Sequence, residues 1–110
     1  MTVLYLDSDQ MGRGDEALGR KLLKSFLKEL LASPYTPDLV GCLNHGVRLT
    51  TTGSPVLEEL RALEAKGSRV ASCGTCLDAF DLRDQLEVGE VGNMAMTVEI
   101  LNTAQRVIRI

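Results

Sequence analysis

Short apolar runs alternate with longer segments of helical periodicity, a pattern that predicts an α/β protein. The run Thr2–Leu6 has no polar break, as is typical of a strand that is covered on both faces. Leu39–Asn44 and Arg69–Cys73 predict the second and third strands. A short run at Glu90–Gly92 and a last run at Arg106–Ile110 complete five predicted strands. Because arginines interrupt the last run, we expect it at a sheet edge or against a partner.

The most regular helical pattern extends from Asp15 to Leu31. Its apolar residues recur at i, i+4 spacing and predict one broad buried face, made of Leu18, Leu22, Leu23, Phe26, Leu27, Leu30 and Leu31. Asp15 and Glu16 favour the positive end of such a helix. Ser33 followed by Pro34 ends it, since the residue before a proline is driven out of the helical conformation.

Three further helices are predicted after the second, third and fourth strands. Ser54 and Pro55 begin the first of them, because serine suits an N-cap and proline the first helical position, and Gly67 ends it. A short helix follows over about Cys76–Phe80, and a last helix begins after Asn93, which can cap it. The alternation predicts a three-layer α/β/α sandwich with a mostly parallel five-stranded sheet.

Composition and charge narrow the functional classes. The 110 residues fit a single domain spanning 1–110, with 45% hydrophobic and 25% charged residues as in folded globular proteins. A net charge of −3 argues against nucleic acid or an anionic membrane surface as a partner. No apolar run approaches the roughly 20 residues of a membrane-spanning helix and no signal-peptide pattern is present, so we expect a cytoplasmic location. Three cysteines are too few for a disulfide scaffold.

The residues that directly follow the strands are the candidates for a functional site, because parallel α/β sheets hold their sites beyond the carboxyl ends of the strands. Cys73 and Cys76 are the candidate catalytic pair. The candidate substrate-binding residues are Ser8, Asp9, Asn44, Gly74, Thr75 and Asn93. We expect no cofactor and no metal ligands.

The Cys73-Gly74-Thr75-Cys76 segment is the sharpest chemical signal. Cys73 closes a strand, Cys76 lies where a helix begins, and Gly74 permits a tight turn between them. The amides and dipole of a helix N-terminus stabilise a thiolate, an argument that by itself favours Cys76. Because the dipole contributes only about 0.3–1 kcal/mol, backbone hydrogen bonds must supply the rest.

Several roles are open to this pair, including that of two inert residues at a strand end. Thioredoxin-like disulfide exchange shares the spacing, but that fold needs a later cis-proline and all three prolines precede Cys73. A zinc site would add Cys42 and His45, although Cys42 lies inside a strand and more simply faces the core. Persulfide transfer needs an accessible thiolate, N–H donors and a docking surface, and no cofactor.

Four segments carry a resemblance to a known family: VLYLDSDQMGRGDEALGRKLLKSFLKEL, LNHGV, GSPVLEELRALEAKGSRVASCGTCLD and VGNM. Over nearly its whole length the chain resembles the DsrE/DsrF-like family, most closely the C-terminal domain of YedF-type proteins, which are sulfurtransferase-like and linked to selenium metabolism. The resemblance implies a five-stranded parallel sheet, a cytoplasmic location and a homo-oligomer, as a dimer, trimer or hexamer. It also implies that the persulfide-carrying cysteine closes the third strand, which is the position of Cys73.

Two departures from the family pattern matter. YedF-type chains usually carry a TusA-like sulfur-carrier domain before this one, so we expect such a carrier to act in trans. Asp81 stands where the family usually has a glycine, which puts the turn after the cysteine helix in doubt.

The sequence thus predicts a cysteine-based carrier of sulfur, or of selenium, that passes sulfane sulfur as a persulfide within a cytoplasmic relay. Cys73 ranks first as the carrier, and Cys76 is a resolving or relay thiol. The alternative is a non-enzymatic oligomeric binding module that holds a metal or small ligand at the Cys73/Cys76 edge.

Overall fold

The computed structural model describes the whole chain, Met1–Ile110, and contains one five-stranded sheet. Its strands are β1 (Thr2–Leu6), β2 (Leu39–Cys42), β3 (Arg69–Cys73), β4 (Glu90–Gly92) and β5 (Arg106–Arg109). They lie in the order β4-β3-β2-β1-β5, and every neighbouring pair is parallel. The predicted sheet is therefore confirmed, with β5 at one edge.

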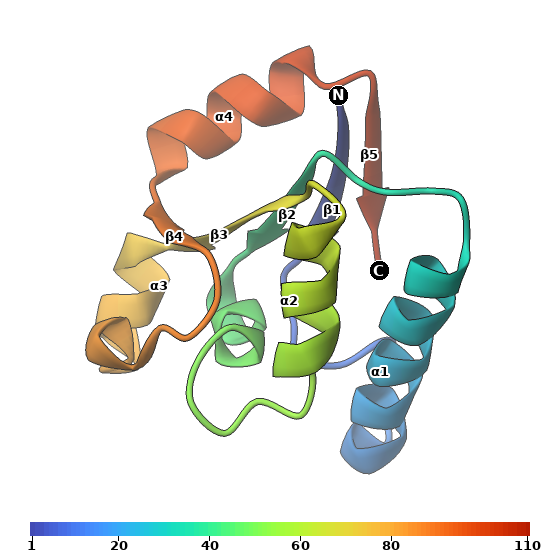
Figure 1. Cartoon of the computed structure of the whole chain (residues 1–110). Helices are drawn as coiled ribbons and strands as arrows, with labels where there is room; N and C mark the ends of the chain where they lie inside the picture. The colour runs from blue at the N-terminus through green and yellow to red at the C-terminus, as the bar shows by residue number, and fades with distance from the viewer.

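Helices cover the two faces of the sheet unequally (Figure 1). They are α1 (Glu16–Ala32), α2 (Leu57–Ala65), α3 (Gly74–Ala79) and α4 (Met94–Thr103), with the short 3₁₀ helices η1 (Asn44–Leu49) and η2 (Arg83–Gln85). From β1 to β4 the chain steps in one direction across the sheet, so right-handed crossovers place α1, α2 and α3 on one face. The chain then returns to β5, and α4 alone covers the other face (Figure 1). This is the predicted α/β/α sandwich.

The hydrophobic core lies between the sheet and the three helices α1, α2 and α3. Side chains alternate between the two faces along each strand, and one set from each strand points into this layer. The core combines Leu4, Leu6, Val40, Cys42 and Val70 of the strands with Leu23, Leu27, Leu60, Leu63 and Leu77 of the helices. The other set of strand residues faces α4.

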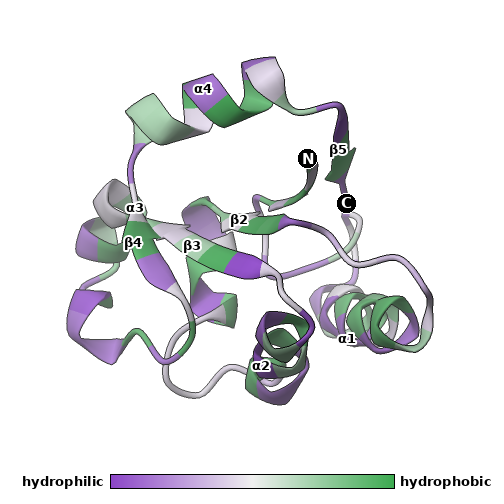
Figure 2. Ribbon diagram, turned by 45° about the horizontal axis from the view of Figure 1, so that its top comes forward, coloured by the Kyte–Doolittle hydropathy of each residue, from purple (hydrophilic) through white to green (hydrophobic).

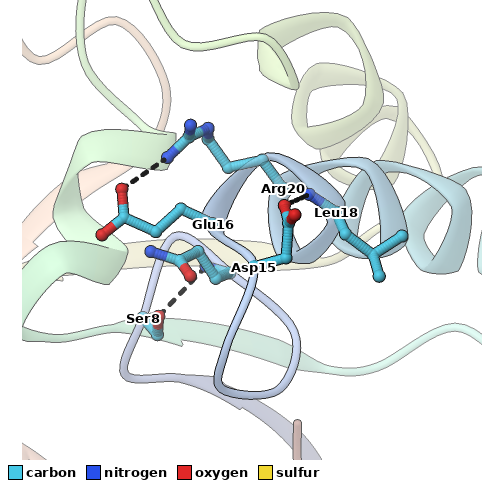
Figure 3. A network of polar contacts seen from close by, with 6 residues as sticks. Ser8, Asp15, Glu16, Leu18 and Arg20 are labelled. Atoms are coloured by element: carbon cyan, nitrogen blue, oxygen red, sulfur yellow. Dashed lines mark hydrogen bonds and ion pairs between the residues drawn. The ribbon is translucent and has the colours of Figure 1, made fainter.

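Helix α1 begins as predicted but buries less of its apolar surface. Asp15 Oδ1 accepts a hydrogen bond from the backbone N–H of Leu18 at 2.8 Å and so caps the helix (Figure 3). Leu23 is 1% exposed, whereas Leu18 is 53% exposed and Leu22 is 43% exposed. The expected broad buried face is therefore wrong for the row of Leu18 and Leu22. Helix α2 packs beside α1 on the side of Lys24, and no helix lies on the opposite side.

Other boundaries also differ from the prediction. Helix α3 begins at Gly74 rather than near Cys76, and strand β5 ends at Arg109 rather than at Ile110. Helix α2 begins at Leu57 rather than at Pro55, because Ser54 Oγ accepts a hydrogen bond from the N–H of Val56 at 3.1 Å and stabilises a turn before the helix. Strand β2 ends at Cys42, because η1 begins two residues later at Asn44.

Asp81 keeps the backbone conformation that a glycine would adopt in the turn after α3. Its φ is 54°, in the left-handed region where aspartate is one of the better tolerated residues. The turn therefore remains available despite the departure from the family pattern. None of the four α-helices is both long and apolar enough to cross a bilayer.

Candidate functional site at the carboxyl edge of the sheet

The cysteine pair lies where β3 passes into α3. Cys73 is the last residue of β3 and the N-cap of α3, and Cys76 lies in the first turn of that helix. Gly74 between them is buried, and an added Cβ would lie 2.7 Å from Nη2 of Arg83 and 3.3 Å from the carbonyl oxygen of Gly92. Close packing, rather than the tight turn that we expected, therefore favours a small residue at position 74.

Hydrogen bonds at the start of α3 stabilise the thiolate of Cys73. Burial raises the pKa of this thiol, but hydrogen bonds to its sulfur from the amide and thiol of Cys76 and from the amide and hydroxyl of Thr75 outweigh that effect. The pKa of Cys73 therefore lies below its ordinary value.

Cys76 has the opposite electrostatic environment. Burial is the largest cause that raises the pKa of its thiol, and the hydrogen bond and charge of Cys73 raise it further. The backbone N–H of Asn44, which donates a hydrogen bond to Cys76 Sγ at 3.2 Å, lowers it only in part. The helix-dipole argument that favoured Cys76 as the more acidic thiol is therefore wrong: Cys73 is the acidic member and Cys76 its hydrogen-bond donor.

The third cysteine belongs to the core. Cys42 is 1% exposed, and burial raises the pKa of its thiol to about 12. No group of three or more His, Cys, Asp or Glu side chains lies close enough together to hold a metal ion. Cys42 and His45 therefore do not complete a zinc site with the cysteine pair.

A cavity of about 150 Å³ lies between α4 and the sheet, beside Cys73. Three small residues, Gly41, Ala71 and Gly92, form much of its floor. Gly41 and Ala71 are neighbours in the register of β2 and β3, and Gly92 pairs with Cys73 across β3 and β4. Absent or short side chains at these adjacent positions leave the space beneath α4 unfilled.

The remaining walls of this cavity are mainly apolar. They include Val3, Leu39 and Leu43 below and Met96, Ile100 and Leu101 of α4 above. Two polar side-chain atoms at the start of α4 that border the cavity form hydrogen bonds within the helix. Asn93 Oδ1 accepts a hydrogen bond from the N–H of Met96 at 2.9 Å, and the hydroxyl of Thr97 donates one to the carbonyl oxygen of Asn93 at 3.1 Å.

The structure distributes the other predicted substrate-binding residues around separate pockets. Ser8 and Asn44 border a polar pocket that also includes Arg109, and Asp9 borders a different pocket with Arg48. Asn93 borders the apolar cavity and caps α4.

Analysis of the sequence missed Tyr5, which lines the same cavity as Cys73. Burial raises the pKa of Tyr5, and the neighbouring charge of Asp7 raises it further. The charge of Arg109 lowers it, and the charges of Cys73 and Cys76 add smaller upward shifts. Tyr5 lies opposite Gly41 in the register of β1 and β2, a pairing that strand-by-strand analysis does not provide.

Two solved structures share this fold over almost the whole chain. The protein of unknown function MTH1491 from Methanobacterium thermoautotrophicum is 24% identical, with a TM-score of 0.73 over 99% of this chain and 97% of its own. The ychN protein from E. coli is 15% identical, with a TM-score of 0.69 over the same shares. The chain therefore shares its overall fold with these two proteins. No protein-family model and no curated protein matches the sequence.

Proposed function

We propose that this chain is a cysteine-based sulfur carrier that accepts sulfane sulfur on Cys73 and passes it to an acceptor thiol. One observation carries the proposal: the only thiol with a lowered pKa lies at the carboxyl edge of the parallel sheet, hydrogen-bonded to a second thiol and beside a cavity. A lowered pKa increases the thiolate fraction at neutral pH, and the thiolate is the nucleophile.

The transfer needs no oxidant and no cofactor. The Cys73 thiolate attacks the outer sulfur of a donor persulfide, R–S–SH, so that a bond forms between that sulfur and Cys73 Sγ and the donor leaves as R–S⁻. An acceptor thiolate then attacks the same outer sulfur, and the Cys73 thiolate is restored.

Cys76 is the resolving thiol in this proposal. When no acceptor is present, the Cys76 thiolate attacks Cys73 Sγ, a Cys73–Cys76 disulfide forms and the outer sulfur leaves as hydrosulfide. A cellular dithiol then reduces the disulfide. The raised pKa of Cys76 supports this order of events, because it slows resolution and leaves time for transfer.

Intact-mass spectrometry after incubation with a persulfide donor tests the proposal. We expect the reduced chain to gain about 32 Da per sulfur atom, the Cys73→Ala variant to gain nothing and the Cys76→Ala variant to retain the adduct. An adduct that survives in Cys73→Ala, or is absent from the reduced native chain, contradicts the proposal. Repeating the loading with a selenide-derived donor distinguishes sulfur from selenium.

The proposed setting is a cytoplasmic relay like that of YedF-type proteins, with a TusA-like carrier acting in trans.

Self-association is part of this proposal and rests on α4. This helix carries a single charged residue, Glu99, yet buries none of its residues, and Met94 is 55% exposed and Val98 56% exposed. It lies alone on its face of the sheet (Figure 2). Apolar helices of this kind are normally covered, and we propose a second copy of the chain as the cover.

The apolar cavity beside Cys73 supports a second candidate, a non-enzymatic module that binds a small ligand there. The two candidates differ in the need for a nucleophile. Ligand binding by such a module would persist in Cys73→Ala, whereas sulfur loading would be lost.

A further inference from the structure

We propose that the cavity beneath α4 holds a chain of several sulfur atoms attached to Cys73, so that the protein carries a polysulfane and not only a single persulfide sulfur. The inference rests on the proposed function and extends it to the chemical form of the cargo. The cavity, its lining and the position of Cys73 carry the argument.

The floor of the cavity is empty because of the residues that face it. Gly41 has no side chain, and a Cβ placed there would meet no atom within 4 Å. Ala71 beside it contributes one methyl group, and Gly92 beside Cys73 contributes none. A side chain of ordinary size at position 41 would have filled this space.

The cavity exceeds what one sulfur atom needs. Its volume is about 150 Å³, and a protein cavity of about that size accommodates benzene, which has six non-hydrogen atoms. Cys73 lies at its wall and is 5% exposed, so atoms added to its sulfur have the cavity as the adjacent free space.

The chemistry of the walls favours a chain of sulfur over a free polar ligand. Ligand pockets normally orient their ligands with a few free polar groups. Here Asn93 Oδ1 and the Thr97 hydroxyl are engaged within α4, Arg69 pairs with Glu90, and Tyr5 supplies the one hydroxyl among the strand residues of the lining that faces α4. Sulfur bound to sulfur is polarizable and forms only weak hydrogen bonds, so apolar walls suit it. The covalent bond to Cys73 fixes one end of the sulfur chain, so its position does not depend on polar groups of the walls.

Inorganic polysulfide supplies such a chain without any oxidant. The Cys73 thiolate attacks an inner sulfur of a hydrogen polysulfide, H–Sn–H, and a bond forms between this sulfur and Sγ. The next S–S bond breaks, and the remainder of the polysulfide leaves as a shorter hydropolysulfide anion. Cys73 then carries the attacked sulfur together with the sulfur atoms on its other side, which end in S–H.

Loading with inorganic polysulfide in variants of the cavity floor tests the inference. The parent is the Cys76→Ala chain, which cannot resolve the adduct. Gly41→Val fills the floor, Gly41→Ala fills less of it, and Val107→Ile adds volume on the same face of the sheet in β5, outside the cavity. Circular dichroism and thermal unfolding establish that each variant is folded before intact masses are compared.

We expect the parent and Val107→Ile to carry species with two or more added sulfur atoms, Gly41→Ala to carry fewer of them, and Gly41→Val to carry only one sulfur. A parent that stops at one sulfur, or a folded Gly41→Val with the parent's distribution, overturns the inference and leaves the single-sulfur function intact. If Gly41→Val does not fold, an unchanged distribution in Gly41→Ala overturns it. An absence of any adduct on Cys73 overturns the proposed function as well.

Discussion

The backbone N–H of Asn44 donates a hydrogen bond to Sγ of Cys76 across 3.2 Å and links the start of η1 to α3. Asn44 has a φ of 50°, in the left-handed region that asparagine tolerates better than most residues. The N–H lowers the pKa of Cys76, but burial and the neighbouring Cys73 raise it by more. The pKa of Cys76 therefore stays above its ordinary value, while that of Cys73 lies below it.

Removing the thiol of Cys76 should make Cys73 less acidic. In Cys76→Ala the sulfur of Cys73 loses a side-chain hydrogen bond, its pKa rises, and its alkylation near neutral pH becomes several-fold slower than in Cys76→Ser, which retains a hydroxyl donor. Alkylation rates measured across a pH series for the two variants check this. The thiolate fraction falls as the pH drops below the pKa, so the Cys76→Ala profile should lie at higher pH. Coincident profiles would show that Cys76 does not act on Cys73.

Cys42 should not react with thiol reagents in the folded chain. Burial holds its pKa at about 12 and leaves it 1% exposed, so neither thiolate nor access is available. Mass spectrometry after brief alkylation should find Cys42 unmodified in the native chain and modified in denaturant. Modification of Cys42 under native conditions at the rate of Cys73 would contradict its placement in the core.

Two glycines should respond to alanine in opposite directions. A Cβ at Gly46 would lie 2.1 Å from the carbonyl oxygen of Leu6, so Gly46→Ala forces backbone apart, and we expect a loss of at least about 2 kcal/mol in the free energy of unfolding. Gly41 has open space around its Cβ position, and alanine there should add about 0.5–1 kcal/mol by restricting the unfolded chain. Urea titrations measure both values. If both substitutions changed the free energy of unfolding equally, either the close contact at Gly46 or the open space at Gly41 would be contradicted.

A charge on the outer face of α4 should separate the copies of the chain. Val98→Asp places a carboxylate where 56% of an apolar residue is exposed, and burial of an unpaired charge in an interface is strongly unfavourable. Sedimentation velocity should show an assembly for the native chain and a 12.0 kDa monomer for the variant. Gln85→Glu in η2 adds one negative charge away from α4 and should leave the assembly unchanged. A native chain that sediments as a monomer refutes self-association.

The elements that depend on local sequence could be predicted, and the contacts between distant strands could not. Asp15 caps α1 and Gly67 follows α2 at a φ of 107° because capping and left-handed turns are set by a few neighbouring residues. The sandwich follows from the order of strands and helices. Leu18 and Leu22 have the right period for burial but lack a helix beside them, which only the packing of α1 against α2 determines.

The sequence predicted the cysteine pair of the candidate site, but not the relative acidity of the two thiols or the cavity beside them. Spacing indicated the cysteine pair, but the relative acidity of Cys73 and Cys76 depends on where individual amides meet each sulfur. The cavity depends on β2 and β3 placing Gly41 next to Ala71, and these residues are far apart in the sequence. The periodicity of a single segment does not show which residues of two strands lie side by side.

The unequal cover of the sheet separates the residues that stabilise the fold from those that surround the cysteine pair. The layer under α1, α2 and α3 holds the packed core, while the reactive sulfur and its hollow lie under α4. Substitutions beneath α4 can therefore change the surroundings of Cys73 while the packed layer on the opposite face stays intact.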